Sequence, residues 1–161
     1  MSIFDLLTDV AKTGRMGPVF SGARWDDVTA ALGEPMNMAL LSGSRDGPEL
    51  LAYGDLEVSA CHCRSVVEAI CVQTWRDVIE LPGRPAEPGP LAYDQVAAAL
   101  DAAACDWEPY PPLTFGTQLT LVTTATGTTF TFEAFDGAPP VLNVVGLLVT
   151  PHGCAENPAA T

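Results

Sequence analysis

The chain has 161 residues, of which 48% are hydrophobic and 17% are charged, a composition that is typical of a compact globular domain and excludes an intrinsically disordered chain. Its net charge is −13, and no lysine or arginine follows Arg84. Nucleic acids and anionic membrane surfaces are therefore not expected partners, because both are bound through clusters of basic side chains.

The N-terminal segment is expected to form a helix over residues 2–13, with Ser2 as its cap and Gly14 at its end. Asp5 and Asp9 interrupt the apolar run that a signal peptide would need, and no segment is long and apolar enough to span a membrane. We therefore expect a cytoplasmic protein whose five cysteines are reduced thiols rather than a disulfide framework.

The first half of the remaining chain begins with an amphipathic helix over residues 25–32, which Gly33 and Pro35 end. Asp26 and Asp27 fall in its first turn, where carboxylates are favoured by the helix dipole. Apolar and β-branched runs then predict antiparallel strands over residues 36–41, 49–53, 56–61 and 66–75. Residues 76–81 give no clear pattern, and the proline-rich residues 82–90 are typical of a stiff connector.

The second half repeats this order. A helix over residues 93–100 matches residues 25–32 position by position, a hairpin around Gly127 joins strands 119–124 and 128–135, and a strand follows over residues 141–150. We predict a single α+β domain over residues 1–150, in which two pseudo-repeats, about 22–81 and 91–150, share one core, followed by a flexible tail over residues 151–161. The alternative is that the halves look alike because α+β domains draw on few patterns.

Residues that could carry chemistry are few. Cys61, His62, Cys63 and Cys71 have metal-ligating side chains, but in a strand His62 would face away from Cys61 and Cys63, so we expect two core thiols, one exposed imidazole and no metal. Asp55 and Glu57 are expected to lie on one strand face in contact with solvent. His152 and Cys154 lie in the tail, where a catalytic geometry is poorly held. Without a nucleotide-binding or hydrolase motif, we expect neither an enzyme nor a cofactor.

An aromatic segment gives the best candidate site. Residues 106–115 form an insertion in the second half that is stiffened by prolines, and they place aromatic side chains beside carboxylates. Protein interfaces concentrate their binding energy in such rigid aromatic anchors. The predicted partner-binding residues are Trp107, Glu108, Tyr110 and Phe115. The alternative is that Trp107 and Tyr110 cover the open end of the core.

Two resemblances bear on function. The run from Gly22 to Pro35, followed by Tyr53 to Val58, resembles small bacterial proteins of actinobacteria, some of which are suspected immunity proteins of toxin systems. The tandem helix-then-sheet order is also similar to that of the β-lactamase inhibitory proteins, although those are secreted and disulfide-bonded. These resemblances imply an α+β fold and a protein partner, and they assign no residue a role.

These observations favour a non-enzymatic protein-binding module, of the type of an immunity inhibitor, whose acidic surface meets a basic partner. On charge alone, however, simple solubility is favoured over attraction to a basic partner. One alternative function is a small-molecule binding or catalytic domain with a pocket between the two halves near His62. Another is a structural subunit that forms a homodimer through an apolar interface. The oligomeric state stays open.

Overall fold

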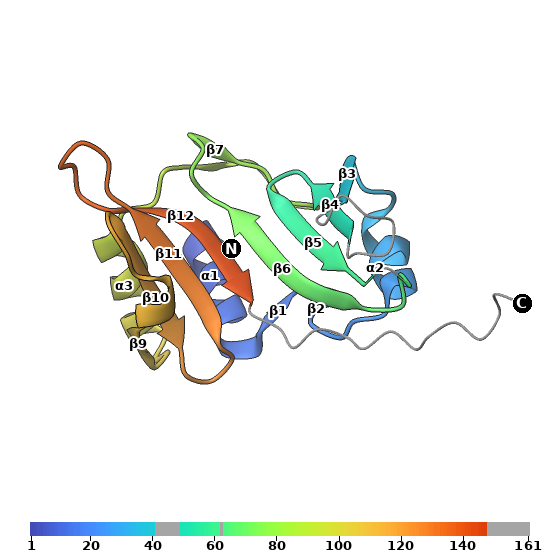
Figure 1. Cartoon of the computed structure of the whole chain (residues 1–161), viewed down its shortest axis with the longest axis horizontal. Coiled ribbons are helices and arrows are strands. Elements are labelled where there is room, and N and C mark those ends of the chain that lie inside the picture. Colours follow the sequence, from blue (N-terminus) through green and yellow to red (C-terminus); the bar gives the residue numbers. More distant parts are fainter. Residues whose placement is uncertain (41–48, 62, 148–161) are drawn as a thin grey trace, which may run out of the picture.

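The computed structural model describes residues 1–40, 49–61 and 63–147. Its α-helices lie on one side of a large antiparallel sheet, and among the described residues the opposite side carries no α-helix (Figure 1). The α-helices are α1 (Ile3–Thr13), α2 (Trp25–Leu32) and α3 (Tyr93–Ala102), and a short 3-10 helix is η1 (Pro111–Leu113). In the part of the chain that is described, no helix is long and apolar enough to cross a membrane.

The large sheet has eight strands in the order β3-β4-β5-β6-β12-β11-β10-β9, and each neighbouring pair is antiparallel. The first half supplies β3 (Asn37–Leu40), β4 (Glu49–Tyr53), β5 (Leu56–Ala60) and β6 (Val67–Gln73). The second half supplies β9 (Trp107–Pro109), β10 (Gln118–Thr123), β11 (Thr128–Glu133) and β12 (Val141–Leu147). The halves meet where β6 pairs with β12, with Val72 opposite Val145. The predicted α+β class is confirmed, and the predicted tail, residues 151–161, lies outside the described residues.

The core lies between the helices and the sheet, because alternate strand residues point toward the helices. Phe130 and Phe132 of β11 are fully buried, and the ring of Phe132 meets the ring of Tyr93 edge to face at 5.0 Å between centroids. Helix α1 and both halves contribute residues of less than 2% exposure to this one core, among them Leu7, Val28, Leu51, Leu56, Val58, Leu100, Leu121 and Leu142.

Helix α1 is fixed at both ends by polar contacts. At its start Ser2 and Asp5 form a reciprocal capping box, and hydrogen bonds from Ser2 hold the pKa of the Asp5 carboxyl below its usual value. At its end the hydroxyl of Thr126, in the β10–β11 turn, donates to the carbonyl oxygen of Ala11 at 2.8 Å. This contact ties the N-terminal helix to the second half of the chain.

The β4–β5 turn contains a buried carboxylate that corrects one prediction. Asp55 is only 3% exposed and lies in the turn before β5, so the expectation of a solvated strand residue is wrong. Its Oδ2 accepts a hydrogen bond from the backbone N–H of Glu80 at 2.8 Å, and its Oδ1 lies 3.5 Å from Nε of Arg76. Because these partners come from residues 76–80, the carboxylate fixes this segment against the sheet.

The segment between the halves also has more structure than the sequence predicts. Strand β7 (Val78–Ile79) pairs with β8 (Glu87–Pro88), so the residues expected to form a plain connector contain one strand of a small hairpin. Ile79 is fully buried. A second two-stranded ribbon, β1 (Arg15–Met16) with β2 (Val19–Phe20), links α1 to α2.

Candidate interaction face

We call the side of the large sheet that carries no α-helix the open face. Strand register identifies its residues, because directly paired residues share a face. One row across the sheet contains Ala52, Glu57, Cys71, Gly146 and Thr129 in that order. A Cβ atom added at Gly146 would lie 3.0 Å from Oγ1 of Thr129 and 3.9 Å from Sγ of Cys71. These short distances confirm that the side chains of this row lie on the same side of the sheet.

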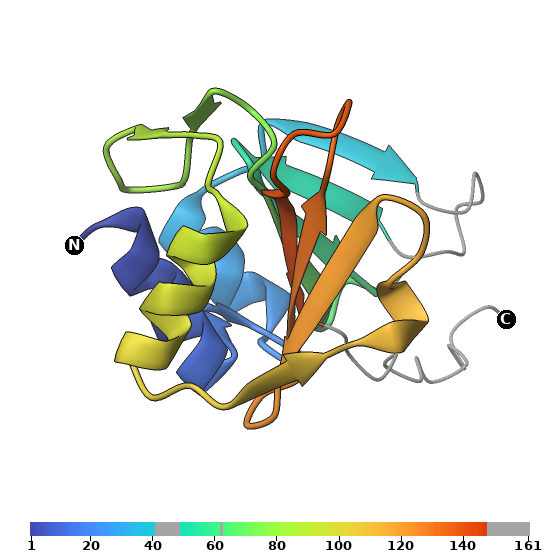
Figure 2. The ribbon, with the colours of Figure 1, turned by 90° about the vertical axis from the view of Figure 1, so that its left-hand side faces the viewer.

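The side chains of the open face are mostly small. A second row contains Gln73, Val144, Thr131 and Thr120, and the hydroxyl groups of its two threonines lie 3.1 Å apart. The two ends of the sheet bend away from the helices, so the open face is concave (Figure 2). A concave face with short side chains lets the surface of another molecule approach the strands closely.

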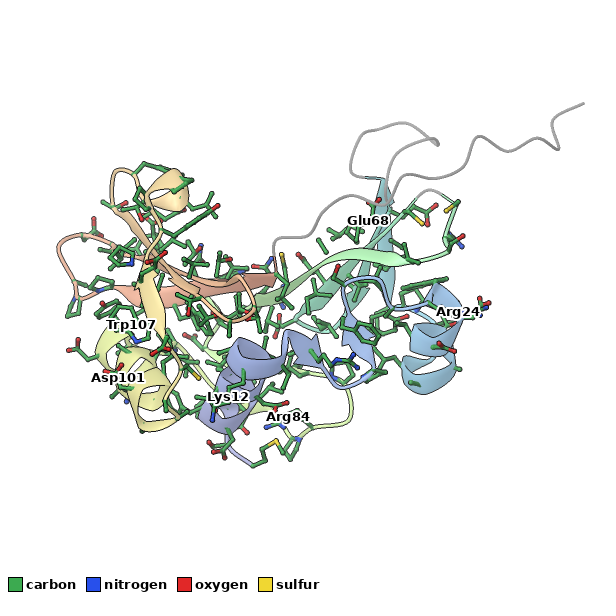
Figure 3. All side chains as sticks on the ribbon, turned by 90° about the horizontal axis from the view of Figure 1, so that it is seen from below. Lys12, Arg24, Glu68, Arg84, Asp101 and Trp107 are labelled. Carbon is green, nitrogen blue, oxygen red and sulfur yellow. The ribbon has the colours of Figure 1, made fainter. Side chains whose placement is uncertain are left out.

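Four glutamates of the sheet lie on the open face. The eight strands contain the glutamates Glu49, Glu57, Glu68, Glu108 and Glu133, and they contain no lysine or arginine. Register places Glu57, Glu108 and Glu133 on the open face. Figure 3 shows Glu68 on the same side, opposite Lys12 and Arg84. The open face is therefore acidic.

The glutamates of this face are held by neighbouring groups. Oε2 of Glu57 accepts a hydrogen bond from Nε2 of Gln73 at 2.8 Å, and Glu133 accepts one from the hydroxyl of Thr117. Both donors are neutral amide or hydroxyl groups, so neither hydrogen bond is an ion pair. Glu49, at the start of β4, is paired with the buried Ala60 and therefore lies on the other side of the sheet, where it forms an ion pair with Arg64.

Three exposed aromatic side chains lie at one end of the sheet, which we call the aromatic end. Trp75 follows β6, Phe135 follows β11, and Phe115 pairs with Gln118 at the start of β10. Because β6 and β11 are both antiparallel to β12, their last residues reach the same end of the sheet, where β10 begins. The exposed fractions are 55% for Trp75, 61% for Phe135 and 63% for Phe115, unusually high for large apolar residues.

The structure separates the four residues predicted to bind a partner. Trp107 is half-buried on the helix side, where its indole Nε1 donates to Oδ1 of Asp101 in α3 at 2.9 Å (Figure 3). Glu108 is exposed on the open face, opposite Val122. Tyr110 is half-buried, and Phe115 belongs to the aromatic end. The predicted insertion contains the edge strand β9, whose alternation directs Trp107 and Glu108 to opposite faces.

Part of this segment folds over the open face. The carbonyl oxygen of Leu113, in η1, accepts hydrogen bonds from Nε2 of Gln118 and from the hydroxyl of Thr120, both at 2.7 Å. Both donors belong to β10, and Thr120 is fully buried as a result. The 3-10 helix therefore covers β10 on the open side and carries Phe115 just beyond it.

The predicted partner-binding residues included neither Trp75 nor Phe135. Each stands two residues after the end of a strand, Gln73 for β6 and Glu133 for β11. The sequence signal was an aromatic residue directly after an apolar strand. That Trp75 and Phe135 lie near each other can be recognised only once the strand order is known, because that order brings these residues, 60 positions apart in the sequence, to one end of the sheet.

Cys61 and Cys63 follow strand β5 rather than lying in it. Strand β5 ends at Ala60, Cys61 is buried, and Cys63 is exposed, so the expectation that both are core thiols is wrong for Cys63. Burial, and then the charge of Glu57, raise the pKa of the Cys71 thiol. His62, His152 and Cys154 lie outside the described residues. Within the described ranges, no group of three or more His, Cys, Asp or Glu side chains could hold a metal ion.

Two neighbouring clefts lie near the end of α2 and share Leu32, Leu81 and Pro82. One has a volume of ≈ 270 Å³ and is lined mainly by apolar residues together with Asp9 and Arg84. The other has a volume of ≈ 310 Å³ and extends toward Glu34. Neither cleft is lined by Cys61 or Cys63, the neighbours of His62, where a pocket was considered.

Comparisons with protein-family models, with curated proteins and with solved structures found no match to this chain.

Proposed function

We propose that the protein is a non-enzymatic binding module whose open face and aromatic end contact a basic surface of a protein partner. The observation that carries the proposal is that Glu57, Glu68, Glu108 and Glu133 lie on the open face (Figure 3), while the eight strands contain no lysine or arginine. A carboxylate-bearing face of this kind attracts a positively charged surface and repels an acidic one. The resemblance to suspected immunity proteins favours an inhibitor of a toxin-like protein as the specific class.

The aromatic end supplies the apolar contacts that charge alone does not give. Strands are about 4.8 Å apart, so aromatic residues next to β6, β11 and β10 span about 15 Å. Buried aromatic anchors dominate the binding energy of many protein interfaces, and surrounding polar contacts exclude water from them. Trp75, Phe135 and Phe115 are available for this role because none of them is buried in the fold.

Charge reversal on the two sides of the sheet tests this proposal. The Glu57→Lys, Glu108→Lys variant places two positive charges on the open face. The control, Asp9→Lys, Glu34→Lys, makes the same change in net charge on α1 and just after α2. Because like charges facing each other across an interface cost several kcal/mol, we expect the open-face variant to bind at least about tenfold more weakly than the control.

The measurement is a pull-down from a lysate of the source organism with the tagged wild type and both variants, scored by quantitative mass spectrometry. The proposal requires a stoichiometric basic protein that is lost with the open-face variant and retained with the control. Equal loss with both variants, or capture of an acidic partner by both, would contradict it. Circular dichroism of each variant establishes that the fold is intact.

We further infer that the two halves arose from one duplicated unit. Each consists of an α-helix followed by four strands, α2 with β3 to β6 and α3 with β9 to β12. The strand order places the two fourth strands side by side at the centre and the two first strands at the edges. This arrangement supports duplication because a two-fold relation between equal units produces the same order.

A further inference from the structure

We propose that Cys61 and Cys63 form a redox-active dithiol that closes to an intramolecular disulfide by exchange with a low-molecular-weight disulfide. Their sulfur atoms lie 3.0 Å apart, which makes them the reactive pair in the described part of the chain. The backbone N–H of Arg64 donates to the carbonyl oxygen of Cys61 at 2.7 Å, and this hydrogen bond helps to hold the two cysteines near each other. The inference is independent of the proposed partner.

The surroundings give the two sulfur atoms different roles. Cys63 is exposed and can meet a small molecule from solvent, whereas Cys61 is only 1% exposed. The Sγ atom of Cys61 accepts hydrogen bonds from the backbone N–H groups of Ser65 at 3.2 Å and Val66 at 3.4 Å. Hydrogen-bond donors directed at a sulfur atom stabilise negative charge on it. Thiol–disulfide exchange needs such charge, because the attacking group and the leaving group are both thiolates.

The exchange proceeds in two steps. The Cys63 thiolate attacks one sulfur of the small disulfide, whose S–S bond breaks, and one small thiolate leaves. The Cys61 thiolate then attacks Sγ of Cys63 in this mixed disulfide, forms the Cys61–Cys63 bond and releases the second small thiolate. The protein loses two electrons and two protons, and the small disulfide gains them as two thiols.

Two other cysteines serve as internal controls. Burial raises the pKa of the thiol of Cys71 and also that of Cys105, so both stay protonated and react slowly near neutral pH. Cys105 is buried and Cys71 is half-buried, so neither thiol is as accessible as that of Cys63. Exchange is therefore expected to begin at Cys63.

The test uses the full chain with Cys154→Ser, reduced and then equilibrated with reduced and oxidised glutathione under argon. After alkylation of the remaining thiols, mass spectrometry of the tryptic peptide that contains both Cys61 and Cys63 identifies the product. We expect loss of two hydrogens in this peptide and no glutathione adduct. We expect the additional change Cys61→Ser to stop the reaction at a glutathione adduct on Cys63, and Cys63→Ser to prevent both products.

A dilution series separates closure from simple adduct formation. Closure consumes one oxidised and produces two reduced glutathione molecules, so diluting the buffer about tenfold at a fixed ratio raises the closed-to-reduced ratio about tenfold. An adduct on Cys63 alone would not respond to this dilution. A stable adduct in the Cys154→Ser protein, no reaction at either cysteine, or a disulfide to Cys71 or Cys105 would each overturn the proposal.

Discussion

Replacing Gly54 by alanine is expected to lower the free energy of unfolding by about 3 kcal/mol. Gly54 has φ +65°, a conformation that costs a side chain about 1–2 kcal/mol. A Cβ atom would also lie 2.5 Å from the carbonyl oxygen of Glu80, and this oxygen cannot move freely because the same backbone is hydrogen-bonded to Asp55. The loss is measured by urea denaturation followed by circular dichroism.

Gly127→Ala is the matched control. Gly127 belongs to the corresponding turn of the second half and has φ +71°, but nothing lies within 4 Å of the added Cβ. Alanine should therefore cost only the conformational part, about 1 kcal/mol. Equal losses in the two variants would show that the β4–β5 turn does not pack on residue 80.

Truncation of Phe130 to alanine is expected to cost about 3–5 kcal/mol, because it removes a large side chain that is fully buried in the shared core. Phe130 lies in β11, opposite Leu121 on one neighbouring strand and Val145 on the other. The remaining cavity would lie under β11, next to the central strand β12, in the core that side chains of both halves share. Thermal and chemical denaturation both report this loss.

Phe115→Ala separates stability from binding. Phe115 is 63% exposed, so its truncation should change the free energy of unfolding by less than about 0.5 kcal/mol. If the aromatic end is part of the interface, the same change should weaken the capture of the partner. A Phe115→Ala protein that is strongly destabilised would place this ring in the core and remove it from the interface.

The local features of the fold could be read from the sequence because each element carries its own signals. Ser2 and Gly14 mark the ends of α1, and the glycines at 54 and 127 mark the hairpin turns. The strand segments were recognisable from their runs of apolar and β-branched residues. The observed strand ends differ from the predicted ends by a few residues. A strand ends where its hydrogen bonding to the neighbouring strand ends, and not where its amino-acid composition changes.

The contacts between distant segments could not be read in this way. The burial of Asp55 depends on the backbone of Glu80, and the segment that provides it gave no pattern of its own. The pairing of β9 with β10 was not evident either: the sequence predicted one aromatic binding segment, and part of that segment is a strand. Its alternation sends Trp107 to α3 and Glu108 to the open face. The aromatic end depends on strand order, which local propensity does not encode.

Carboxyl footprinting of the isolated complex tests the central claim most directly. A carbodiimide and an amine label exposed carboxylates, and mass spectrometry compares each site with and without the captured partner. The account predicts that Glu57, Glu68, Glu108 and Glu133 lose labelling in the complex, while Asp9, Asp26 and Asp94 on the helix side keep it. Protection of the helix-side carboxylates with unchanged labelling of the four glutamates would contradict it.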